Sequence, residues 1–149
     1  MCGRFVTTTP TDEIAGIFDA RPANDLPEVP DYNVCPTDLV AVVVAGRKLV
    51  PMRWGFIPRW YKTPSDGPLL INARAETLAQ KPAFQEACRT RRCLIPATGF
   101  YEWTKDAEGN RLPWYIAPAN GLLAFAGVWQ VWERGDTRHV TCAIVTTGA

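Results

Sequence analysis

The sequence predicts an α+β domain with a mostly antiparallel sheet, barrel-like or sandwiched, and a few short helices. Short valine-rich and aromatic runs follow one another along the chain, separated by turn signals rich in glycine, aspartate and asparagine. Two short segments have helical character. The chain has 149 residues, 47% of them hydrophobic, which is enough for one core, so we expect one domain over residues 1–149.

The first third of the chain contains a helix, a loop and a hairpin. Residues 9–18 begin Thr-Pro-Thr-Asp-Glu and continue with apolar residues on one stripe, which predicts a short capped helix. Residues 21–36 contain four prolines and are expected to form an ordered loop. Two apolar runs, 39–45 and 48–54, are joined by Gly46-Arg47 and predict a β-hairpin.

The remaining two thirds are predicted to be mainly strands. Residues 54–68, rich in proline, glycine and aromatic residues, predict a structured loop. Residues 69–75 look extended, and 82–88 look like a brief helix with proline in its first turn. Five further strands are expected at residues 93–96, 100–105, 112–117, 123–133 and 139–147.

Composition excludes several classes of protein. No stretch of eighteen apolar residues and no signal-peptide pattern occurs, so we expect a cytoplasmic protein. The five cysteines lack a C-x-x-C spacing, and the single histidine, His139, lies in a strand-like segment. We therefore expect no metal site, no disulfide framework and a structural role for His139.

Positive charge is concentrated in one part of the chain. The net charge is only +1, but residues 53–92 contain eight basic and three acidic residues beside several aromatic ones. Cations that follow phosphates, together with rings that stack on bases, form the kind of groove that binds single-stranded nucleic acid. A solvated basic surface is the alternative.

Cys2 is the most reactive candidate, because it follows the initiator Met1. Removal of Met1 would leave a residue with both a free α-amine and a thiol. With an aldehyde, the amine can form an imine and the thiol can then add to the same carbon, which gives a thiazolidine ring. With an amide or ester, the thiol can attack while the amine acts as base. A buried cysteine that behaves as a small hydrophobe is the alternative.

Two further segments could contribute polar groups to a site. Asn72, Arg74 and Glu76 are spaced by two, so on an extended strand they share one face, from which an arginine can hold phosphate oxygens. Glu102 lies between Tyr101 and Trp103, surroundings that suit a general acid or base. The outer faces of ordinary strands would explain both patterns equally well.

Taken together, these segments resemble the SOS-response-associated peptidase (SRAP) family. The matching stretches run in order across almost the whole chain: Met-Cys-Gly-Arg-Phe at 1–5, Tyr-Asn-Val-Cys-Pro at 32–36, Arg-Trp-Gly-Phe-Ile-Pro at 53–58, Asn-Ala-Arg-Ala-Glu-Thr at 72–77, Arg-Cys-Leu-Ile-Pro at 92–96, Gly-Phe-Tyr-Glu-Trp at 99–103, Ala-Gly-Val-Trp at 126–129 and Val-Thr-Thr at 145–147.

The resemblance implies a DNA-damage (SOS) protein that binds single-stranded DNA at an abasic site and crosslinks to it through Cys2. It also implies a monomer that needs no metal or cofactor and is associated with the nucleoid when bound to DNA. It implies Asn72 and Glu102 as catalytic partners of Cys2. The implied DNA contacts are Arg4, Asn33, Pro36, Trp54, Trp60 and Arg74. Alternatives are an N-terminal-nucleophile peptidase or amidohydrolase and a non-covalent single-strand binder.

The chain departs from the family pattern at its C-terminal end. Family members continue to a His-Asp-Arg-x-Pro motif whose histidine belongs to the active site, whereas this sequence stops at Ala149. We expect crosslinking by Cys2 and Glu102 to persist and crosslink reversal to be impaired.

Overall fold

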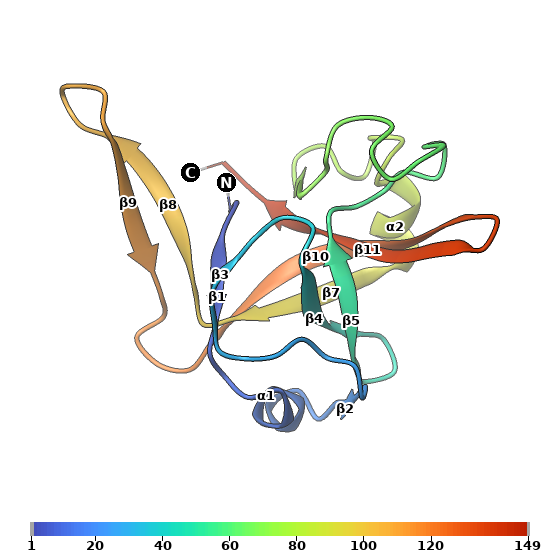
Figure 1. Ribbon diagram of the computed structural model, residues 1–149, viewed down its shortest axis with the longest axis horizontal. Helices are drawn as coiled ribbons and strands as arrows, with labels where there is room; N and C mark the ends of the chain where they lie inside the picture. Colours follow the sequence, from blue (N-terminus) through green and yellow to red (C-terminus); the bar gives the residue numbers. More distant parts are fainter. Residues whose placement is uncertain (1, 149) are drawn as a thin grey trace.

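The computed structural model describes residues 2–148, and strands dominate it (Figure 1). In chain order the elements are β1 (Phe5–Thr7), α1 (Thr11–Ile17), β2 (Arg21–Pro22), β3 (Asp31–Val34), β4 (Leu39–Val44), β5 (Lys48–Trp54), β6 (Asn72–Arg74), α2 (Gln85–Thr90), β7 (Arg92–Ala97), β8 (Gly99–Lys105), β9 (Arg111–Ile116), β10 (Leu123–Arg134) and β11 (Thr137–Thr146).

Five strands close into a barrel. The order β5-β4-β7-β10-β11 is antiparallel at every step, and the ring closes where β11 pairs with β5 in parallel, Thr141 opposite Arg53 and Cys142 opposite Trp54. Side chains such as Val42 fill the interior and are fully buried. The predicted barrel-like, mostly antiparallel α+β fold is therefore confirmed.

A second sheet, in the order β3-β1-β8-β9, lies beside the barrel. Aromatic rings join the two parts. The ring centroid of Phe5 on β1 lies 5.0 Å from that of Trp54 and 5.8 Å from that of Phe125 of β10, and the centroids of Phe100 of β8 and Phe125 are 5.7 Å apart. Such pairs stabilise a core beyond the area they bury. The β8–β9 hairpin continues outward from this junction and stands away from the barrel (Figure 1).

Several local predictions are confirmed and others are corrected. The hairpin of β4 and β5 turns at Gly46 and Arg47, both with positive φ. The predicted loop 21–36 contains β2 and β3, because these short segments find partners in β5 and β1. The second helix lies at Gln85–Thr90 rather than 82–88.

The two helices are short. The N-cap of α1 is Pro10, which makes no side-chain capping bond, so the predicted side-chain cap is not present, although Ile14 is buried as expected. Neither described helix has the length and apolar character needed to cross a membrane.

Candidate functional site

Cys2 lies against β6, where one contact with a residue distant in sequence and one contact with a near neighbour hold it. The side-chain amide of Asn72 donates from Nδ2 to the Cys2 carbonyl oxygen at 3.1 Å. The Cys2 thiol donates to the Arg4 carbonyl oxygen at 3.8 Å, a long contact typical of sulfur. Only 5% of Cys2 is exposed. The backbone that carries the predicted nucleophile is therefore oriented by Asn72.

The Cys2 thiol is electrostatically coupled to Glu102. Burial raises the pKa of the Cys2 thiol to about 11; a hydrogen bond with the Arg4 backbone lowers it, and the negative charge of Glu102 raises it. The thiol is therefore protonated at neutral pH in this chain. Because Glu102 acts on this pKa, the β8 strand must bring its carboxylate near Cys2. The three predicted catalytic residues are thus brought together.

The expected removal of Met1 concerns a residue outside the described range 2–148. In the unprocessed chain the Cys2 nitrogen is a peptide nitrogen, so the free amine required for aldehyde chemistry exists only after that cleavage.

Arg74 and Glu76 form a clasp beside Asn72. Ala73 is buried between Asn72 and Arg74, as the predicted alternation requires. The Glu76 carboxylate lies 3.5 Å from Arg74 Nε and accepts hydrogen bonds from Thr147 Oγ1 at 2.9 Å and the Gly148 N–H at 3.0 Å. These donors, the Gly148 N–H above all, lower the pKa of Glu76 from 4.5 to about 2. The end of β11 is thereby held close to Arg74.

A groove lies beside Cys2, lined by its neighbours Gly3, Arg4 and Asn72, and consists of three adjoining hollows of about 210, 370 and 740 Å³. The first two share Arg4 and Trp103, and the last two share Asn72. The two larger hollows are within the size range of small-molecule sites. We call this feature the aromatic groove; besides the buried Tyr61 and Phe84, its rings and cations are Arg4, Tyr32, Trp60, Arg74, Lys81, Tyr101, Trp103 and Arg111.

The rings of the aromatic groove are available to a ligand. Tyr32, Trp60 and Trp103 are 64%, 57% and 46% exposed. Exposed rings next to cations can stack on bases while the cations neutralise phosphates. The groove therefore has the chemistry to bind a single nucleic-acid strand across the Cys2 site.

Four of the six predicted DNA contacts lie along the aromatic groove. Arg4 and Asn33 occupy one end, where Arg4 Nη1 donates to Asn33 Oδ1 at 3.4 Å. Arg74 and Trp60 line the other end. Pro36 is half-buried just after β3.

Trp54 requires a correction, because it cannot present its ring to DNA. It is fully buried in the barrel, and its indole Nε1 donates to the Ile71 carbonyl oxygen at 3.0 Å. The resemblance implied Trp54 as a DNA contact, but its position on the inward side of β5 places the ring in the core.

The basic run at 53–92 does not form one binding face. Arg53 is half-buried and donates to the Gly55 carbonyl oxygen at 2.9 Å, Arg59 pairs with Glu86 at 2.9 Å, and Arg92 donates to the Cys88 carbonyl oxygen at 2.7 Å. Of the run, Arg74 and Lys81 line the groove. Several guanidinium groups of this run are therefore bound within the protein and do not face the groove.

Sequence reasoning singled out Glu102 on β8 but did not identify the rings and the cation that line the groove from the β8–β9 hairpin. Arg111 lies over the Trp103 ring at 4.8 Å, and the Tyr101 hydroxyl donates to the Tyr32 carbonyl oxygen at 3.1 Å. The signal that could have found them is the spacing of Tyr101 and Trp103 by two on an extended hairpin, which places both rings on one face.

His139 lies away from this site, as expected for a structural residue. It packs on Trp132 with ring centroids 5.9 Å apart, near the turn of the β10–β11 hairpin. Ile144, which pairs with Asn72, is five residues further along β11, a separation of roughly 17 Å at the usual rise of a strand.

Comparison with known proteins gives consistent results. The family model described as SOS response associated peptidase (SRAP) matches residues 1–149. The chain is 37% identical over 155 residues to abasic site processing protein YoqW of Bacillus subtilis, covering 99% of this chain and 68% of that protein. It is 32% identical over 145 residues to abasic site processing protein YedK of Escherichia coli, covering 91% of this chain and 63% of that protein.

A solved structure of a protein from Bacteroides thetaiotaomicron has the same fold. Its TM-score is 0.86 at 24% identity, with 98% of this chain and 68% of that chain covered. The chain thus spans about two thirds of the length of the proteins that it resembles.

Proposed function

Because this chain belongs to the SOS response associated peptidase (SRAP) family, we propose that it processes abasic sites in DNA and does so by forming a covalent bond through Cys2. The name shared by the relatives, abasic site processing protein, supports the first part. The covalent step and the preference for single strands are further proposals that rest on the geometry of the site.

One observation carries this proposal: Asn72, which lines the aromatic groove, bonds to the Cys2 carbonyl oxygen, and the negative charge of Glu102 acts on the Cys2 thiol. An abasic deoxyribose opens to an aldehyde, and a residue with an adjacent amine and thiol traps an aldehyde as a stable five-membered ring. The rings and cations on either side of Cys2 suit a nucleic-acid strand that carries such a sugar.

The proposed reaction begins after Met1 has been removed. The Cys2 amine attacks the aldehyde carbon of the sugar, and the resulting carbinolamine loses water to give an imine. The Cys2 sulfur then adds to the same carbon and closes the thiazolidine. One carbon–nitrogen bond and one carbon–sulfur bond form, and the aldehyde oxygen leaves as water.

The residues around Cys2 have separate proposed roles. The hydrogen bond from Asn72 to the Cys2 carbonyl oxygen fixes the direction in which the terminal amine points. Because the thiol is protonated at neutral pH, it must lose its proton during ring closure, and the neighbouring Glu102 carboxylate is the proposed acceptor. Arg4 and Arg74 are proposed to hold phosphates on the two sides.

The test is intact-mass spectrometry after incubation with a single-stranded oligonucleotide that carries one abasic site. The expected product has the summed mass of des-Met protein and oligonucleotide less one water. Cys35→Ala is the matched control and should react normally, because the Cys35 thiol bonds to the Asn33 carbonyl oxygen rather than reaching Cys2.

Two further variants separate the chemical steps. Cys2→Ala should give no stable adduct, and Cys2→Ser should give an imine that survives only after borohydride reduction. A stable adduct of unreduced Cys2→Ala would overturn the covalent role of the thiol, and failure of the wild-type des-Met protein to react would overturn the proposed function.

The name of the family also supports a proposal of self-processing, in which the Cys2 thiol promotes cleavage of the bond after Met1. Translation in a cell-free system without methionine aminopeptidase provides the test. Wild-type protein should lose Met1 whereas Cys2→Ala should retain it; equal retention by both would contradict self-processing. A lyase-like strand cleavage is a further proposed activity, because an imine that is not closed by sulfur can eliminate the 3′ phosphate.

A further inference from the structure

The loop that presents Trp60 to the groove is held from beneath by buried side chains. We call residues 55–61 the tryptophan loop. Its Ile57 N–H donates to Thr141 Oγ1 at 3.1 Å, and the Ile57 carbonyl oxygen accepts from Gln130 Nε2 at 3.0 Å. Both polar groups of the Ile57 backbone are therefore bound by side chains of the β10–β11 hairpin.

Gln130 and Thr141 are unusual among residues 2–148, because they are the two polar residues that are buried, at 3% and 0% exposure. The Thr141 hydroxyl also donates to the Gln130 carbonyl oxygen at 3.1 Å. A buried polar group without a partner is costly, so each of these groups requires the loop to stay where it is. The bonds consequently favour one position of Ile57.

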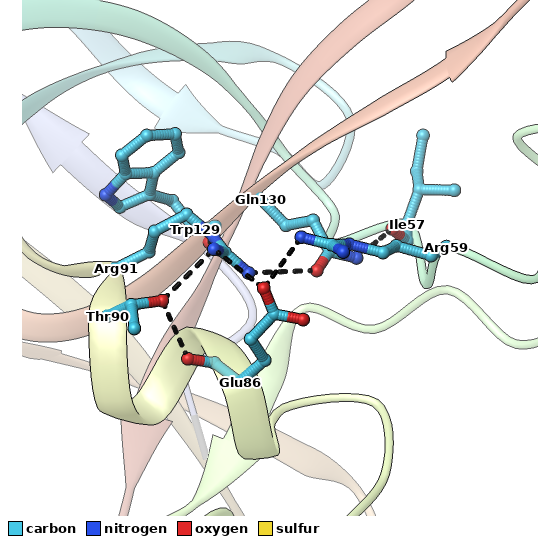
Figure 2. A network of polar contacts seen from close by, with 7 residues as sticks. All are labelled: Ile57, Arg59, Glu86, Thr90, Arg91, Trp129 and Gln130. Atoms are coloured by element: carbon cyan, nitrogen blue, oxygen red, sulfur yellow. Dashed lines mark hydrogen bonds and ion pairs between the residues drawn. The ribbon is translucent and has the colours of Figure 1, made fainter.

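A chain of polar contacts extends from Gln130 to the surface and returns to the same loop. Figure 2 shows Glu86 between two arginines: its Oε1 lies 2.9 Å from Arg59 Nη2 and 3.4 Å from Arg91 Nη1. Arg91 Nη2 in turn donates to Gln130 Oε1 at 3.4 Å. Ile57 and Arg59 are thus held through a closed ring of contacts, and Trp60 is the next residue.

We propose that Gln130 is a positioning residue for DNA binding, which holds the tryptophan loop so that the Trp60 ring is already placed for stacking before DNA arrives. This inference rests on the proposed function. Gln130 is itself buried and cannot touch DNA. It acts through Ile57, because a loop ordered during folding does not have to be ordered again on binding.

The main test uses Gln130→Met, which has similar length and no amide. The concentration of abasic single-stranded DNA giving half the maximal rate of adduct formation should rise roughly tenfold, because an unordered loop must be immobilised on binding. The maximal rate should stay within about twofold, because Cys2, Asn72 and Glu102 lie outside the loop. Amide hydrogen exchange of residues 55–61 should become faster.

A double-mutant cycle connects the effect to Trp60. Trp60→Ala alone should weaken DNA binding by about tenfold, the usual value of one stacked base. Adding Gln130→Met should then change the half-saturating concentration by less than about twofold, because the ring it places is gone. A further tenfold loss in the double variant would overturn the proposal.

Two variants separate positioning from general destabilisation. Leu49→Ala is the matched control, because Leu49 is fully buried beside α1 in a separate cluster; it should lower stability without changing the half-saturating concentration or the exchange of residues 55–61. Gln130→Glu keeps the acceptor for Arg91 but cannot donate to Ile57, and it serves if Gln130→Met does not fold. It should have the same effects.

The exchange measurement distinguishes failure of this inference from failure of the proposed function. Unchanged exchange of residues 55–61 in a folded Gln130 variant would overturn the positioning role whatever DNA does. Faster exchange in the variants, together with a wild-type protein that neither binds nor reacts with DNA, would overturn the proposed function and the DNA-binding role of Gln130 with it.

Discussion

The aromatic groove is lined at one end by the tryptophan loop and at the other by the β8–β9 hairpin. We call these two parts its walls, and they are built differently. The tryptophan loop is tied to the barrel by hydrogen bonds to buried groups, including one from Trp132 Nε1 to the Tyr61 carbonyl oxygen at 2.9 Å. The β8–β9 hairpin stands away from the barrel (Figure 1), and its side-chain contacts are on the surface, such as Trp114 Nε1 to Thr104 Oγ1 at 2.7 Å. Buried bonds give high local stability and exposed bonds low local stability, so we expect one fixed and one adaptable wall.

The largest difference is expected for the tryptophans that support each wall. Trp132 is 2% exposed, so Trp132→Ala should lower the free energy of unfolding by about 3–5 kcal/mol through lost packing and a lost hydrogen bond. Trp114 is 57% exposed, and Trp114→Ala should cost less than ~1 kcal/mol. Urea denaturation of both variants measures the difference; equal losses would remove the contrast between the walls.

A smaller difference is expected for the two threonines. Thr141→Val leaves the Ile57 N–H and the Gln130 carbonyl oxygen without their buried partner, which should cost about 1–3 kcal/mol. Thr104→Val removes an exposed acceptor and should cost no more than ~0.5 kcal/mol. Thermal unfolding gives both values, and a Thr141→Val variant as stable as wild type would show that the loop is not fixed from beneath.

Removing one positive charge should weaken DNA binding equally on both walls, but only on the β8–β9 wall should it also loosen the local structure. Arg111→Gln and Lys81→Gln should each reduce the slope of log affinity against log salt by about 0.7, the value of one phosphate contact on a single strand. Arg111→Gln should also speed amide exchange in the hairpin, because it removes the cation over Trp103.

Arg47→Gln serves as the control for both variants, because Arg47 lies in the turn of the β4–β5 hairpin, where it pairs with Asp19, and does not line the aromatic groove. It should leave the salt slope unchanged. A slope altered as much by this control would mean that net charge, and not the groove, accounts for binding.

The smallest effect is expected just after β6, where Glu76 accepts the Gly148 N–H. The pKa of Glu76 is lowered from 4.5 to about 2. The contribution of its ionised carboxylate to the stability of the folded chain is therefore complete above about pH 4.5 and is lost as the pH falls towards 2. The amide signal of Gly148 should shift with an apparent pKa near 2 in NMR titrations, and this shift should be absent in Glu76→Gln. A midpoint near the ordinary value of a glutamate would contradict the clasp.

Much of the fold was accessible from local patterns. The valine-rich run before Gly46 and the mixed run after Arg47 became β4 and β5, as predicted, because strand patterns and turn chemistry act between near neighbours. Short elements were harder: β2 has two residues and exists only because β5 lies beside it. The shift of the second helix to Gln85–Thr90 likewise reflects local backbone bonds that the pattern did not specify.

The site was accessible in part for the same reason. The spacing of Asn72 and Arg74 predicted that they share a face, the family resemblance implied their roles, and Cys2 was predicted from its position and its chemistry. Trp54 was misplaced because burial depends on which side of the barrel a ring faces, and Arg111 was missed because its partner Trp103 lies across a hairpin.

The sequence by itself determined the strand-rich fold class and the family, and it predicted Cys2 as the candidate nucleophile, since these depend on residue type and short-range order. Only the tertiary structure decided which residues share a site: Asn72 meets Cys2 across seventy positions, and Gln130 meets Ile57 across seventy-three. The physical reason is that hydrogen bonds and burial act over a few ångströms in space, and only the pairing and packing of strands that are distant in sequence bring such segments within that range.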